Sequence, residues 1–504
     1  MSANEARSNV LRSGARWGSD FTSRYNAVVE RLRGKSVVVV GVGVSNLPVI
    51  RFLAGAGAKV TACDRKTGEE LGATLEKLSG LPVGFRLGPD YLEGLDKFDM
   101  MFLTPGIPRD IPQIAAARAA GVTESSEIQL FFELCPAPIV GITGSDGKTT
   151  TTTLVGKALE ASGKRVFVGG NIGNPLLEQV EHMTPDAVVV LELSSFQLQA
   201  MEMSPHIGVI LNIYPNHMDY HRSMQEYIDA KANIVSHQRP QDFAVLNQDN
   251  EAVRGIGERC RSRRIFFTRL AEPGEGVFVR GEEIWIRLGA REEVACLKSD
   301  IRVPGEHNVE NVLAVTAVAG LLGVESGVLR DVLREFKGVE HRLELVGELG
   351  GVRFYNDSIA TTPSRAIAGL RAFEEPLILI AGGYDKKLPF DEFAEVVLDR
   401  VKVLVLVGDT AGQIEAAVQR AAGSRAGARA RAGAGVEAAD RGFRDISSPK
   451  IVRCRDFDEA VLCAVRSAAP GDIVLLSPAC ASFDMFKDYK ERGRRFKEIV
   501  SSLS

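Results

Sequence analysis

One short run of residues has the composition of a phosphate-binding loop. Residues 141–150 read Gly-Ile-Thr-Gly-Ser-Asp-Gly-Lys-Thr-Thr, between an apolar stretch and a segment with helical periodicity. Strand, glycine loop and helix in this order present backbone N–H groups and a helix N-terminus to phosphate oxygens. Lys148 can neutralise terminal phosphates, and Thr149 can offer its hydroxyl to Mg²⁺. The run predicts a nucleoside triphosphate site, although Ile142 replaces a glycine of the strict motif; a flexible surface turn is the alternative.

Three further side chains are expected near this loop. Glu192 and His217 follow two apolar runs that read as strands, and Lys231 lies on an amphipathic segment. A parallel sheet would gather all three at its carboxyl edge, where open α/β folds bind ligands. Glu192 can hold Mg²⁺. Considered alone, a lysine on a helix is usually a solvated charge, and a single histidine usually finds its hydrogen-bond partners nearby. The prediction therefore depends on all three residues occurring together with the loop.

The elements that would position these residues form three α/β units. The first begins at 36–43, a buried strand that runs into a glycine turn, and a second strand ends at Asp64, where a Rossmann unit has its ribose-binding acid. Asn46 occupies the place of the third glycine. A dinucleotide, another phosphate-bearing ligand and a purely structural turn therefore all stay open.

The second unit carries the phosphate loop, and the third follows it. Residues 342–348 and 352–355 read as a hairpin joined across two glycines, and further strands alternate with helices. Residues 421–439 are nearly all Ala, Gly and Arg. With so little apolar bulk to bury, we expect a mobile surface insertion at about 421–440.

Composition limits the class of protein. The chain has 504 residues, of which 45% are hydrophobic, and a formal charge of −4, which argues against general binding to nucleic acid or to a membrane surface. No run is long and apolar enough to span a bilayer, and the first residues lack the apolar core of a secretory signal. Seven scattered cysteines fit a reducing compartment. We expect a cytoplasmic globular protein with a loosely ordered tail at 1–34.

Seven motifs in order add up to a family resemblance. They are Gly-Ile-Thr-Gly-Ser-Asp-Gly-Lys-Thr-Thr at 141–150, Gly-Gly-Asn-Ile-Gly at 169–173, Leu-Glu-Leu-Ser-Ser-Phe-Gln-Leu at 191–198, Gly-Glu-His-Asn at 305–308, His-Arg at 341–342, Asn-Asp-Ser at 356–358 and Leu-Ser-Pro-Ala-Cys-Ala-Ser-Phe-Asp at 476–484. From about residue 35 to the end, the chain resembles the Mur ligase family. The resemblance implies an α/β fold of three domains in series: a Rossmann-like domain that binds a UDP substrate (35–136), a central P-loop ATPase-type domain (137–340) and a Rossmann-like glutamate-binding domain (341–504).

The resemblance also implies an activity. An ATP-dependent ligase would add D-glutamate to UDP-N-acetylmuramoyl-L-alanine through an acyl phosphate, in peptidoglycan precursor synthesis. It would use ATP and two Mg²⁺ sites, act as a monomer, and bind neither nucleic acid nor the membrane interior. Closure of the third domain would exclude water from the acyl phosphate.

Site residues carry over motif by motif as implications of the resemblance. Lys148, His217 and Lys231 would be catalytic, with Lys231 carbamylated. ATP would contact Gly144, Ser145, Asp146, Gly147, Lys148, Thr149, Thr150, Asn308, Arg342 and Asp357. The metal ligands would be Thr149, Glu192, His217 and carbamylated Lys231. The UDP substrate would contact Ser45, Asp64, Arg65, Lys66, Thr104, Gly106 and Asn171, and glutamate would contact Thr361, Lys386, Ser482, Phe483 and Tyr489.

Three positions depart from the family pattern. Ile359 stands where several relatives have Lys, Asn216 replaces an Asp before the expected metal histidine, and Tyr489 replaces a Phe. These departures concern amino-acid binding, so a ligase for L-glutamate stays open, as does a folate polyglutamylating enzyme. A nucleotide switch and an NAD-dependent dehydrogenase that uses the first glycine turn are the alternatives from other classes.

Overall fold

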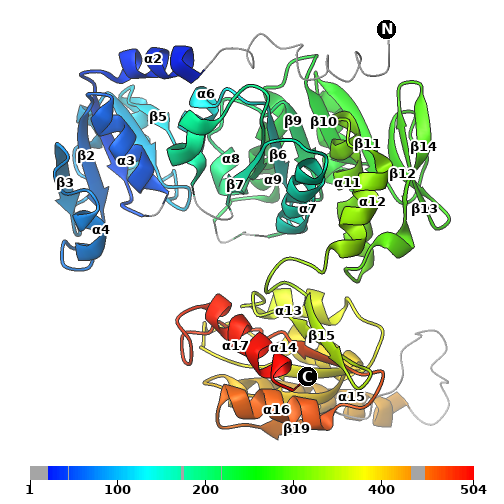
Figure 1. The fold of residues 1–504 in the computed structure, drawn as a ribbon. Helices are drawn as coiled ribbons and strands as arrows, with labels where there is room; N and C mark the ends of the chain where they lie inside the picture. The colour runs from blue at the N-terminus through cyan, green and yellow to red at the C-terminus, as the bar shows by residue number, and fades with distance from the viewer. Residues whose placement is uncertain are drawn as a thin grey trace. The chain divides into compact units, whose positions relative to one another are not determined.

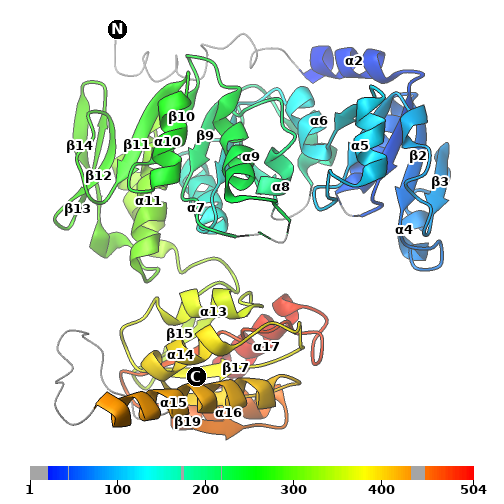
Figure 2. The ribbon, with the colours of Figure 1, turned by 180° about the vertical axis from the view of Figure 1, so that it is seen from behind.

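The computed structural model describes residues 21–43, 45–171, 175–216, 218, 220–432 and 449–503. It has three α/β sheets in series along the chain, as the sequence predicts (Figures 1 and 2). The chain divides into two compact units, Met1–Asp300 with Val309–Arg334, and Ile301–Asn308 with Glu335–Ser504. The first unit holds two of the sheets and the second unit holds the third.

The first sheet is fully parallel, in the order β3-β2-β1-β4-β5. Its strands are β1 (Ser36–Val40), β2 (Lys59–Asp64), β3 (Val83–Leu87), β4 (Met100–Leu103) and β5 (Thr123–Ser125). The helices around it are α2 (Phe21–Leu32), α3 (Asn46–Gly55), α4 (Gly72–Glu76), η1 (Leu95–Lys97), α5 (Pro112–Ala119) and α6 (Glu127–Leu134). The valines of β1 point alternately into two separate cores, which places β1 in the middle of the layered structure.

The central sheet has nine strands in the order β14-β13-β12-β11-β10-β9-β6-β8-β7. They are β6 (Ile139–Thr143), β7 (Val166–Gly170), β8 (Val188–Glu192), β9 (Ile207–Ile210), β10 (Phe243–Asn247), β11 (Arg263–Thr268), β12 (Gly276–Arg280), β13 (Glu283–Leu288) and β14 (Arg291–Leu297). Pairing is parallel from β7 to β12 and antiparallel from β12 to β14. Its helices are α7 (Lys148–Ala161), η2 (Leu176–His182), α8 (Ser195–Leu198), α9 (Met224–Ser236), α10 (Glu251–Arg259), η3 (Lys298–Asp300), α11 (Glu306–Leu321) and α12 (Ser326–Glu335).

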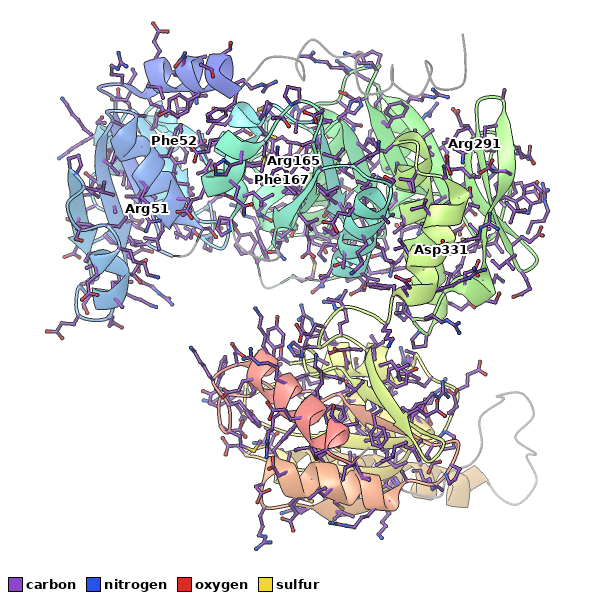
Figure 3. All side chains as sticks on the ribbon, in the orientation of Figure 1. Arg51, Phe52, Arg165, Phe167, Arg291 and Asp331 are labelled. Carbon is purple, nitrogen blue, oxygen red and sulfur yellow. The ribbon has the colours of Figure 1, made fainter. Side chains whose placement is uncertain are left out.

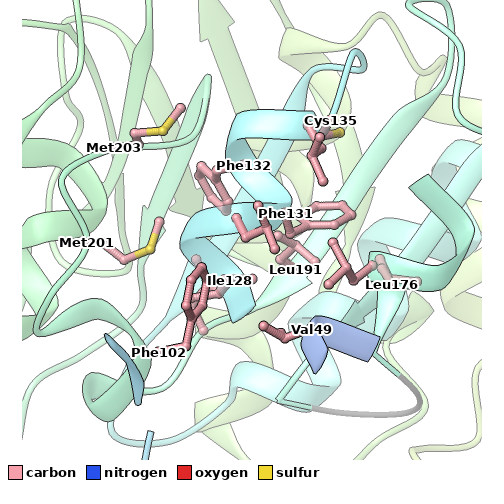
Figure 4. Close-up of a cluster of buried hydrophobic side chains, with 14 of the residues drawn as sticks. Val49, Phe102, Ile128, Phe131, Phe132, Cys135, Leu176, Leu191, Met201 and Met203 are labelled. Carbon is pink, nitrogen blue, oxygen red and sulfur yellow. The ribbon is translucent and has the colours of Figure 1, made fainter. Parts of the chain in front are cut away.

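Helix α6 joins the first two sheets. Nearly all of its residues are buried, and Phe131 and Phe132 belong to one continuous core that includes Phe102 of β4 and Leu191 of β8 (Figure 4). Arg51 of α3, labelled in Figure 3, pairs with Glu178 of η2 at 2.6 Å across the same junction. The first two sheets therefore belong to one packed unit.

The third sheet has the order β15-β16-β20-β17-β18-β19. Its strands are β15 (Glu344–Leu349), β16 (Val352–Asn356), β17 (Leu377–Ala381), β18 (Val401–Leu406), β19 (Lys450–Arg453) and β20 (Ile473–Leu476). β15 and β16 form the expected antiparallel hairpin, and the remaining pairs are parallel. Helices α13 (Pro363–Leu370), α14 (Asp391–Arg400) and α15 (Ala411–Ala432) share one core with the sheet, and α16 (Phe457–Ser467) and α17 (Tyr489–Ser501) share the other.

Part of the expected N-terminal tail is folded, so the prediction of a loose segment at 1–34 is wrong for 21–32. Helix α2 buries Val28 and Leu32, and its Arg31 pairs with Glu133 of α6 at 2.5 Å. Apolar residues at helical spacing give this helix a buried stripe, which its many polar residues concealed in the sequence. Residues 1–20 lie outside the described residues.

The mobile surface insertion expected at about 421–440 overlaps helix α15, so that prediction is wrong for the first residues of the segment. Ala421 is buried in the third-sheet core, and Arg425 forms ion pairs with Glu395 and Asp399 of α14. Alanine and arginine both favour helix strongly, which explains why the helix runs on to Ala432. Residues 433–448 lie outside the described residues, and their mobility stays a prediction.

Candidate active site

The loop between β6 and α7 has the conformation that its glycines predict. Gly147 has a φ of +82° and caps the N-terminus of α7. A Cβ atom on Gly147 would overlap the side-chain oxygen of Asn311 in α11, and a Cβ on Gly144 would lie 3.0 Å from the carbonyl oxygen of Asp146. Only glycine leaves room for this tight turn, which aims the first turn of α7 out of the carboxyl edge of the sheet.

Two side chains from outside the loop fix its shape. Asn212 accepts a hydrogen bond from the Asp146 backbone N–H at 2.9 Å and donates one to the Asp146 carbonyl at 3.3 Å. The Ser145 hydroxyl donates to the Tyr214 carbonyl at 3.0 Å and lies 3.1 Å from the Tyr227 hydroxyl. These protein contacts hold the loop in its conformation, which limits the ordering that binding requires.

Glu192 lies directly beside the loop, as predicted. Its carboxylate accepts a hydrogen bond from the Thr149 hydroxyl at 2.7 Å and another from the Asn171 amide at 2.8 Å. The Glu192 side chain is buried. Thr149 and Glu192 therefore present oxygen atoms at one point, the arrangement that a hard cation such as Mg²⁺ requires.

Lys148 and Lys231 converge on one carbonyl group. Both ammonium groups donate to the Gly144 carbonyl at 2.8 Å; Lys148 also donates to the Ser145 carbonyl and Lys231 to the Thr143 hydroxyl. Lys231 lies over the Tyr227 ring and is only 1% exposed. Burial, followed by the charge of Lys148, holds the pKa of Lys231 well below its ordinary value. The lowered pKa favours the neutral amine of this lysine, which is the form that reacts with CO₂.

One expected metal ligand, His217, lies outside the described residues. Among the residues that the structure does describe, no group of three or more His, Cys, Asp or Glu side chains surrounds a possible metal position. The Thr149–Glu192 pair fits part of a Mg²⁺ site, and carbamylation of Lys231 would add the further oxygens that its amine lacks.

In the first sheet, the expected UDP contacts follow three neighbouring parallel strands. Asp64, at the end of β2, accepts hydrogen bonds from the backbone N–H groups of Val42 at 2.7 Å and Lys66 at 3.0 Å. Thr104 packs against Gly41 of the glycine turn. Arg65, Lys66 and Gly106 are exposed at the same edge. Ser45 lines a pocket with Gly170, the neighbour of Asn171, so the structure brings the first-sheet contacts toward the central sheet.

In the third sheet, the expected glutamate contacts follow β16, β17 and β20, which are adjacent and parallel. Arg492 of α17 ties two of these loops together, because its guanidinium donates to the carbonyls of Ser358, Cys480 and Ala481. Tyr384 pairs with Ala481 and so links the loop after β17 to the loop after β20. The loops after β16, β17 and β20 are therefore held to one another by hydrogen bonds. These loops carry Thr361, Lys386, Ser482 and Phe483.

The side chains of the expected glutamate contacts differ in burial and in the charges around them. Ser482 is buried, and Phe483 is 64% exposed with its ring 5.8 Å from the Tyr384 ring. Lys386 has a lowered pKa because of partial burial and the nearby charge of Arg365. Tyr489 packs edge-on against His341, and its backbone carbonyl accepts from the Ser358 hydroxyl. The cationic surroundings of Lys386 suit an anionic ligand.

Of the nucleotide contacts expected near the third sheet, Asp357 is the most constrained. It accepts hydrogen bonds from the Ser477 hydroxyl at 2.8 Å and the Leu343 N–H at 3.3 Å. Burial raises its pKa to about 7, opposed by the Ser477 hydrogen bond and by the charge of Arg342. The Asn308 amide donates to the Pro304 carbonyl at 2.6 Å.

Comparison with known proteins shows to which family the chain is similar. Three family models match in chain order: the N-terminal domain of MurD-like Mur ligases at 35–125, the Mur ligase middle domain at 142–319 and the glutamate ligase domain of Mur ligases at 341–480. The UDP-N-acetylmuramoylalanine–D-glutamate ligase of Symbiobacterium thermophilum is 48% identical over 468 residues, 92% of this chain and 98% of that protein. The chain belongs to the Mur ligase family. The enzyme of the same name from Acetivibrio thermocellus is 45% identical over 483 residues, 96% of this chain and all of that protein.

Solved structures of Mur ligases share the fold. UDP-N-acetylmuramate-alanine ligase MurC from Thermotoga maritima has a TM-score of 0.52 at 21% identity, over 93% of this chain and all of that one. A pseudomurein peptide ligase type C from Methanothermus fervidus has a TM-score of 0.52 at 18% identity, over 94% of this chain and all of that one. Within the part of the chain that the structure describes, no helix of this Mur ligase has the length and apolar character needed to cross a bilayer.

Several residues of this Mur ligase site were missed by the sequence analysis. Asn212, Tyr227 and Asn311 brace or flank the phosphate loop, and Arg492 holds the third-sheet loops. Tyr220 donates to the carbonyl of Ile107 at 3.0 Å, which links the loop after β4 to the central sheet. The sequence signal for Asn311 was its position three residues after Asn308, one helical turn along α11. The other contacts join residues that are far apart in the chain.

Proposed function

We propose that this Mur ligase joins D-glutamate to UDP-N-acetylmuramoyl-L-alanine at the expense of ATP, in the synthesis of peptidoglycan precursors. The observation that carries the proposal is 48% identity over nearly the full length of a relative with that activity in its name. The braced phosphate loop, the Thr149–Glu192 pair and the buried Lys231 supply groups that the reaction needs. A monomer in the cytoplasm is part of the proposal.

The chemistry starts from a carboxylate, which is a poor electrophile. Transfer of the γ-phosphoryl group of ATP to the terminal carboxylate of the acceptor gives an acyl phosphate and ADP. The glutamate amine then attacks the carbonyl carbon, inorganic phosphate leaves, and the nitrogen loses a proton to give the amide. Lys148 stabilises the charge on the transferring phosphoryl group, and the N-terminus of α7 aligns it.

Lys231 contributes as a carbamate. Its neutral amine adds to CO₂ with loss of a proton, which replaces a cation by an anion with two oxygen atoms. Thr149, Glu192, His217 and this carbamate would hold Mg²⁺, which when bound neutralises phosphate charge. The low pKa of Lys231 supports this modification, since an ammonium ion does not react with CO₂.

The glutamate subsite is proposed on the third sheet. Glutamate carries two carboxylates and one reacting amine, so its pocket needs a cation and several N–H or hydroxyl donors. Lys386, Thr361 and Ser482 supply that set. Ile359 and Tyr489 alter the neighbourhood, but they remove none of these three groups.

The test is release of phosphate with each substrate omitted in turn. We expect release only when ATP, the UDP-muramoyl-L-alanine acceptor and D-glutamate are all present, together with a product heavier than the acceptor by one glutamyl residue. A larger kcat/KM for L-glutamate would refute the D assignment. Lys386→Ala should lower kcat/KM for D-glutamate by roughly 10- to 100-fold. Lys387→Ala, the exposed neighbour, is the matched control and should retain the wild-type value.

A further inference from the structure

Tyr220 lies where a loop of the first sheet meets a loop of the central sheet. Its hydroxyl donates to the carbonyl of Ile107 at 3.0 Å and lies 3.4 Å from the carbonyl of Pro105. Both carbonyls belong to the loop after β4, and Thr104 of this loop packs against Gly41 in the first glycine turn. All of these elements belong to one compact unit. One hydroxyl group therefore joins the first-sheet loop to the segment that follows β9.

The ring of Tyr220 is held on the central-sheet side. It packs edge-on against Phe196 at 4.5 Å and against His221 at 5.2 Å, measured between ring centroids. His221 is only 1% exposed, and its Nε2 atom lies 3.0 Å from the Ser195 hydroxyl. Ser195 and Phe196 begin α8, shortly after Glu192 at the end of β8. The ring of Tyr220 thus belongs to the structure around the expected Mg²⁺ ligand.

The same aromatic cluster reaches the phosphate loop. The rings of His221 and Tyr227 lie 5.1 Å apart, and the Tyr227 hydroxyl is 3.1 Å from the Ser145 hydroxyl. Contacts therefore run without a break from the loop after β4, through Tyr220, to the loop between β6 and α7. Spatial continuity alone does not establish a functional link, so the chemistry of the link decides what it can do.

A second contact joins the same two loops but has a different character. Arg222 pairs with Asp110 at 3.3 Å, and their side chains are 67% and 53% exposed. An exposed ion pair contributes little, because water and salt screen it and both side chains lose conformational freedom. The Tyr220 hydrogen bond is better protected, since this residue is half-buried. Burial also raises the pKa of Tyr220, so the phenol keeps its proton and stays a donor.

Packing explains the ring of Tyr220 but not its hydroxyl. A phenylalanine would pack equally well against Phe196 and His221, and a buried hydroxyl costs free energy unless it forms a hydrogen bond. The acceptor of that bond is a backbone carbonyl in a loop far away in the sequence. What the hydroxyl adds is therefore a fixed distance between two loops.

The proposed reaction depends on such a distance, and this step rests on the proposed function. The first-sheet loops would hold the acceptor, with Thr104 and Gly106 among its contacts, and the phosphate loop of the central sheet would hold ATP. Phosphoryl transfer requires the attacking oxygen to lie close to the phosphorus atom and in line with the leaving group. A shift of one loop relative to the other would misplace one reactant.

We propose that Tyr220 is a positioning residue for phosphoryl transfer, and that its hydrogen bond to the Ile107 carbonyl aligns the acceptor carboxylate with the γ-phosphoryl group of ATP. Tyr220 acts through the loop after β4 and does not itself bind either substrate. Alignment matters only when both substrates are bound. Removal of the hydroxyl therefore slows the transfer step and leaves the affinity for each substrate unchanged.

The test removes the hydroxyl and keeps the ring. A single turnover of Tyr220→Phe with ATP and the UDP-muramoyl-L-alanine acceptor, without glutamate, isolates the transfer step, and its rate is the rate of ADP formation. We expect this rate to fall about tenfold, the value of one hydrogen bond, while the KM values for ATP and for the acceptor stay close to wild type. Asp110→Asn is the matched control, because it weakens the exposed contact between the same loops, and it should transfer at the wild-type rate.

A wild-type transfer rate in Tyr220→Phe would overturn the inference. A raised KM for the acceptor or for ATP at an unchanged transfer rate would do the same, since the hydroxyl would then serve binding. Thermal unfolding separates positioning from a structural role. A lower unfolding temperature with every kinetic constant unchanged would show that the hydroxyl is structural.

A fluorinated tyrosine at position 220 decides the question even if Tyr220→Phe does not fold. Fluorination lowers the pKa of a phenol, and a phenolate cannot donate to a carbonyl. The transfer rate of this enzyme should match wild type at low pH and fall as the pH rises through the phenol pKa, and a pH profile identical to wild type would overturn the inference. Failure of the proposed function looks different: the wild-type enzyme would then form no acceptor-dependent ADP, and the inference would fail with it.

Discussion

In both the first and the central sheet, a buried parallel strand runs into a glycine turn and a helix, and an acidic residue ends the neighbouring strand. In the first sheet, Asp64 accepts the backbone N–H of Val42, so the acid occupies a donor that an anion would otherwise use. In the central sheet, Glu192 instead accepts from two side chains, the Thr149 hydroxyl and the Asn171 amide. The same local motif therefore gives two different sites.

The cations near the two turns differ as well. Lys148 and Lys231 both donate to the central loop at Gly144, whereas Arg65 and Lys66 lie exposed beside the first turn. A triphosphate needs oriented positive charge, and Lys148, which donates to two loop carbonyls, provides it in the central loop. The first turn suits the neutral or singly charged parts of a nucleotide. The function of a glycine turn thus depends on what its flanking acid and its cations contact.

The largest expected effect comes from removing the lysine of the central loop. Lys148→Ala should lower kcat/KM for ligation by about 10³-fold or more, because the phosphoryl group loses its nearest cation. The fold should persist, since the side chain is only half-buried and donates to the carbonyls of the loop rather than packing in a hydrophobic core. Steady-state kinetics and thermal unfolding measure the two effects. Lys157→Ala, on the exposed face of the same helix, is the control, and activity of Lys148→Ala within a few-fold of wild type would remove the phosphate-loop assignment.

Lys231 has the next largest expected effect. Lys231→Ala should lose about 10²- to 10³-fold in kcat, and small carboxylates such as formate should partly restore it by occupying the place of the carbamate. Lys231→Arg should be equally impaired but not rescued, because the guanidinium fills the space and cannot form a carbamate. A crystal structure with all substrates bound and a bare ammonium at Lys231, together with full activity, would count decisively against the carbamate.

The sequence was sufficient to predict β1, β6 and the glycine turns that follow them. Apolar runs that end in glycine located β1 and β6, and motif spacing placed Lys148, Thr149 and Glu192 together. Such features are local, or they follow from the rule that parallel strands bring their carboxyl ends to one edge. The resemblance to Mur ligases supplied the order of the domains.

Other features could not be read from local patterns. Asn46 stands where the dinucleotide-binding motif has its third glycine, and its amide donates to the Val40 and Gly41 carbonyls. The motif shows only that a glycine is missing and does not reveal these stabilising hydrogen bonds. The antiparallel strands β12–β14 were not anticipated, and Arg492 showed no signal, since its partners are contributed by distant loops. Tertiary contacts decide all three features, and no local propensity encodes them.

A moderate effect is expected at the acid of the first turn. Asp64→Asn removes a charge that accepts two backbone N–H groups, so we expect the KM for the UDP acceptor to rise roughly tenfold with little change in the KM for ATP. Asp90→Asn, an exposed site in the same domain, should change neither value. Calorimetry adds a test of ligand class: binding of NAD without binding of a UDP-sugar would overturn the assignment of this turn.

The smallest expected effects come from the two asparagines that brace the turns, and they test whether the sites act independently. Asn46 donates to Val40 and Gly41 at 3.2 and 2.9 Å, and Asn212 exchanges two hydrogen bonds with Asp146 at 2.9 and 3.3 Å. Replacing either by alanine should cost about 1–3 kcal/mol of stability, measured by denaturant unfolding, because buried carbonyl or N–H groups lose their partners.

Their kinetic effects should separate. Because each asparagine holds only its own turn, Asn46→Ala should raise the KM for the UDP acceptor a few-fold, and Asn212→Ala should raise the KM for ATP by a similar factor. The double variant should show both changes multiplied together, since residues without shared partners contribute independently. If instead each variant raised both KM values, the two turns would be energetically coupled. The packed junction at α6 and the Tyr220 hydrogen bond to Ile107 would then be the contacts to vary next, because both connect the first sheet to the central one.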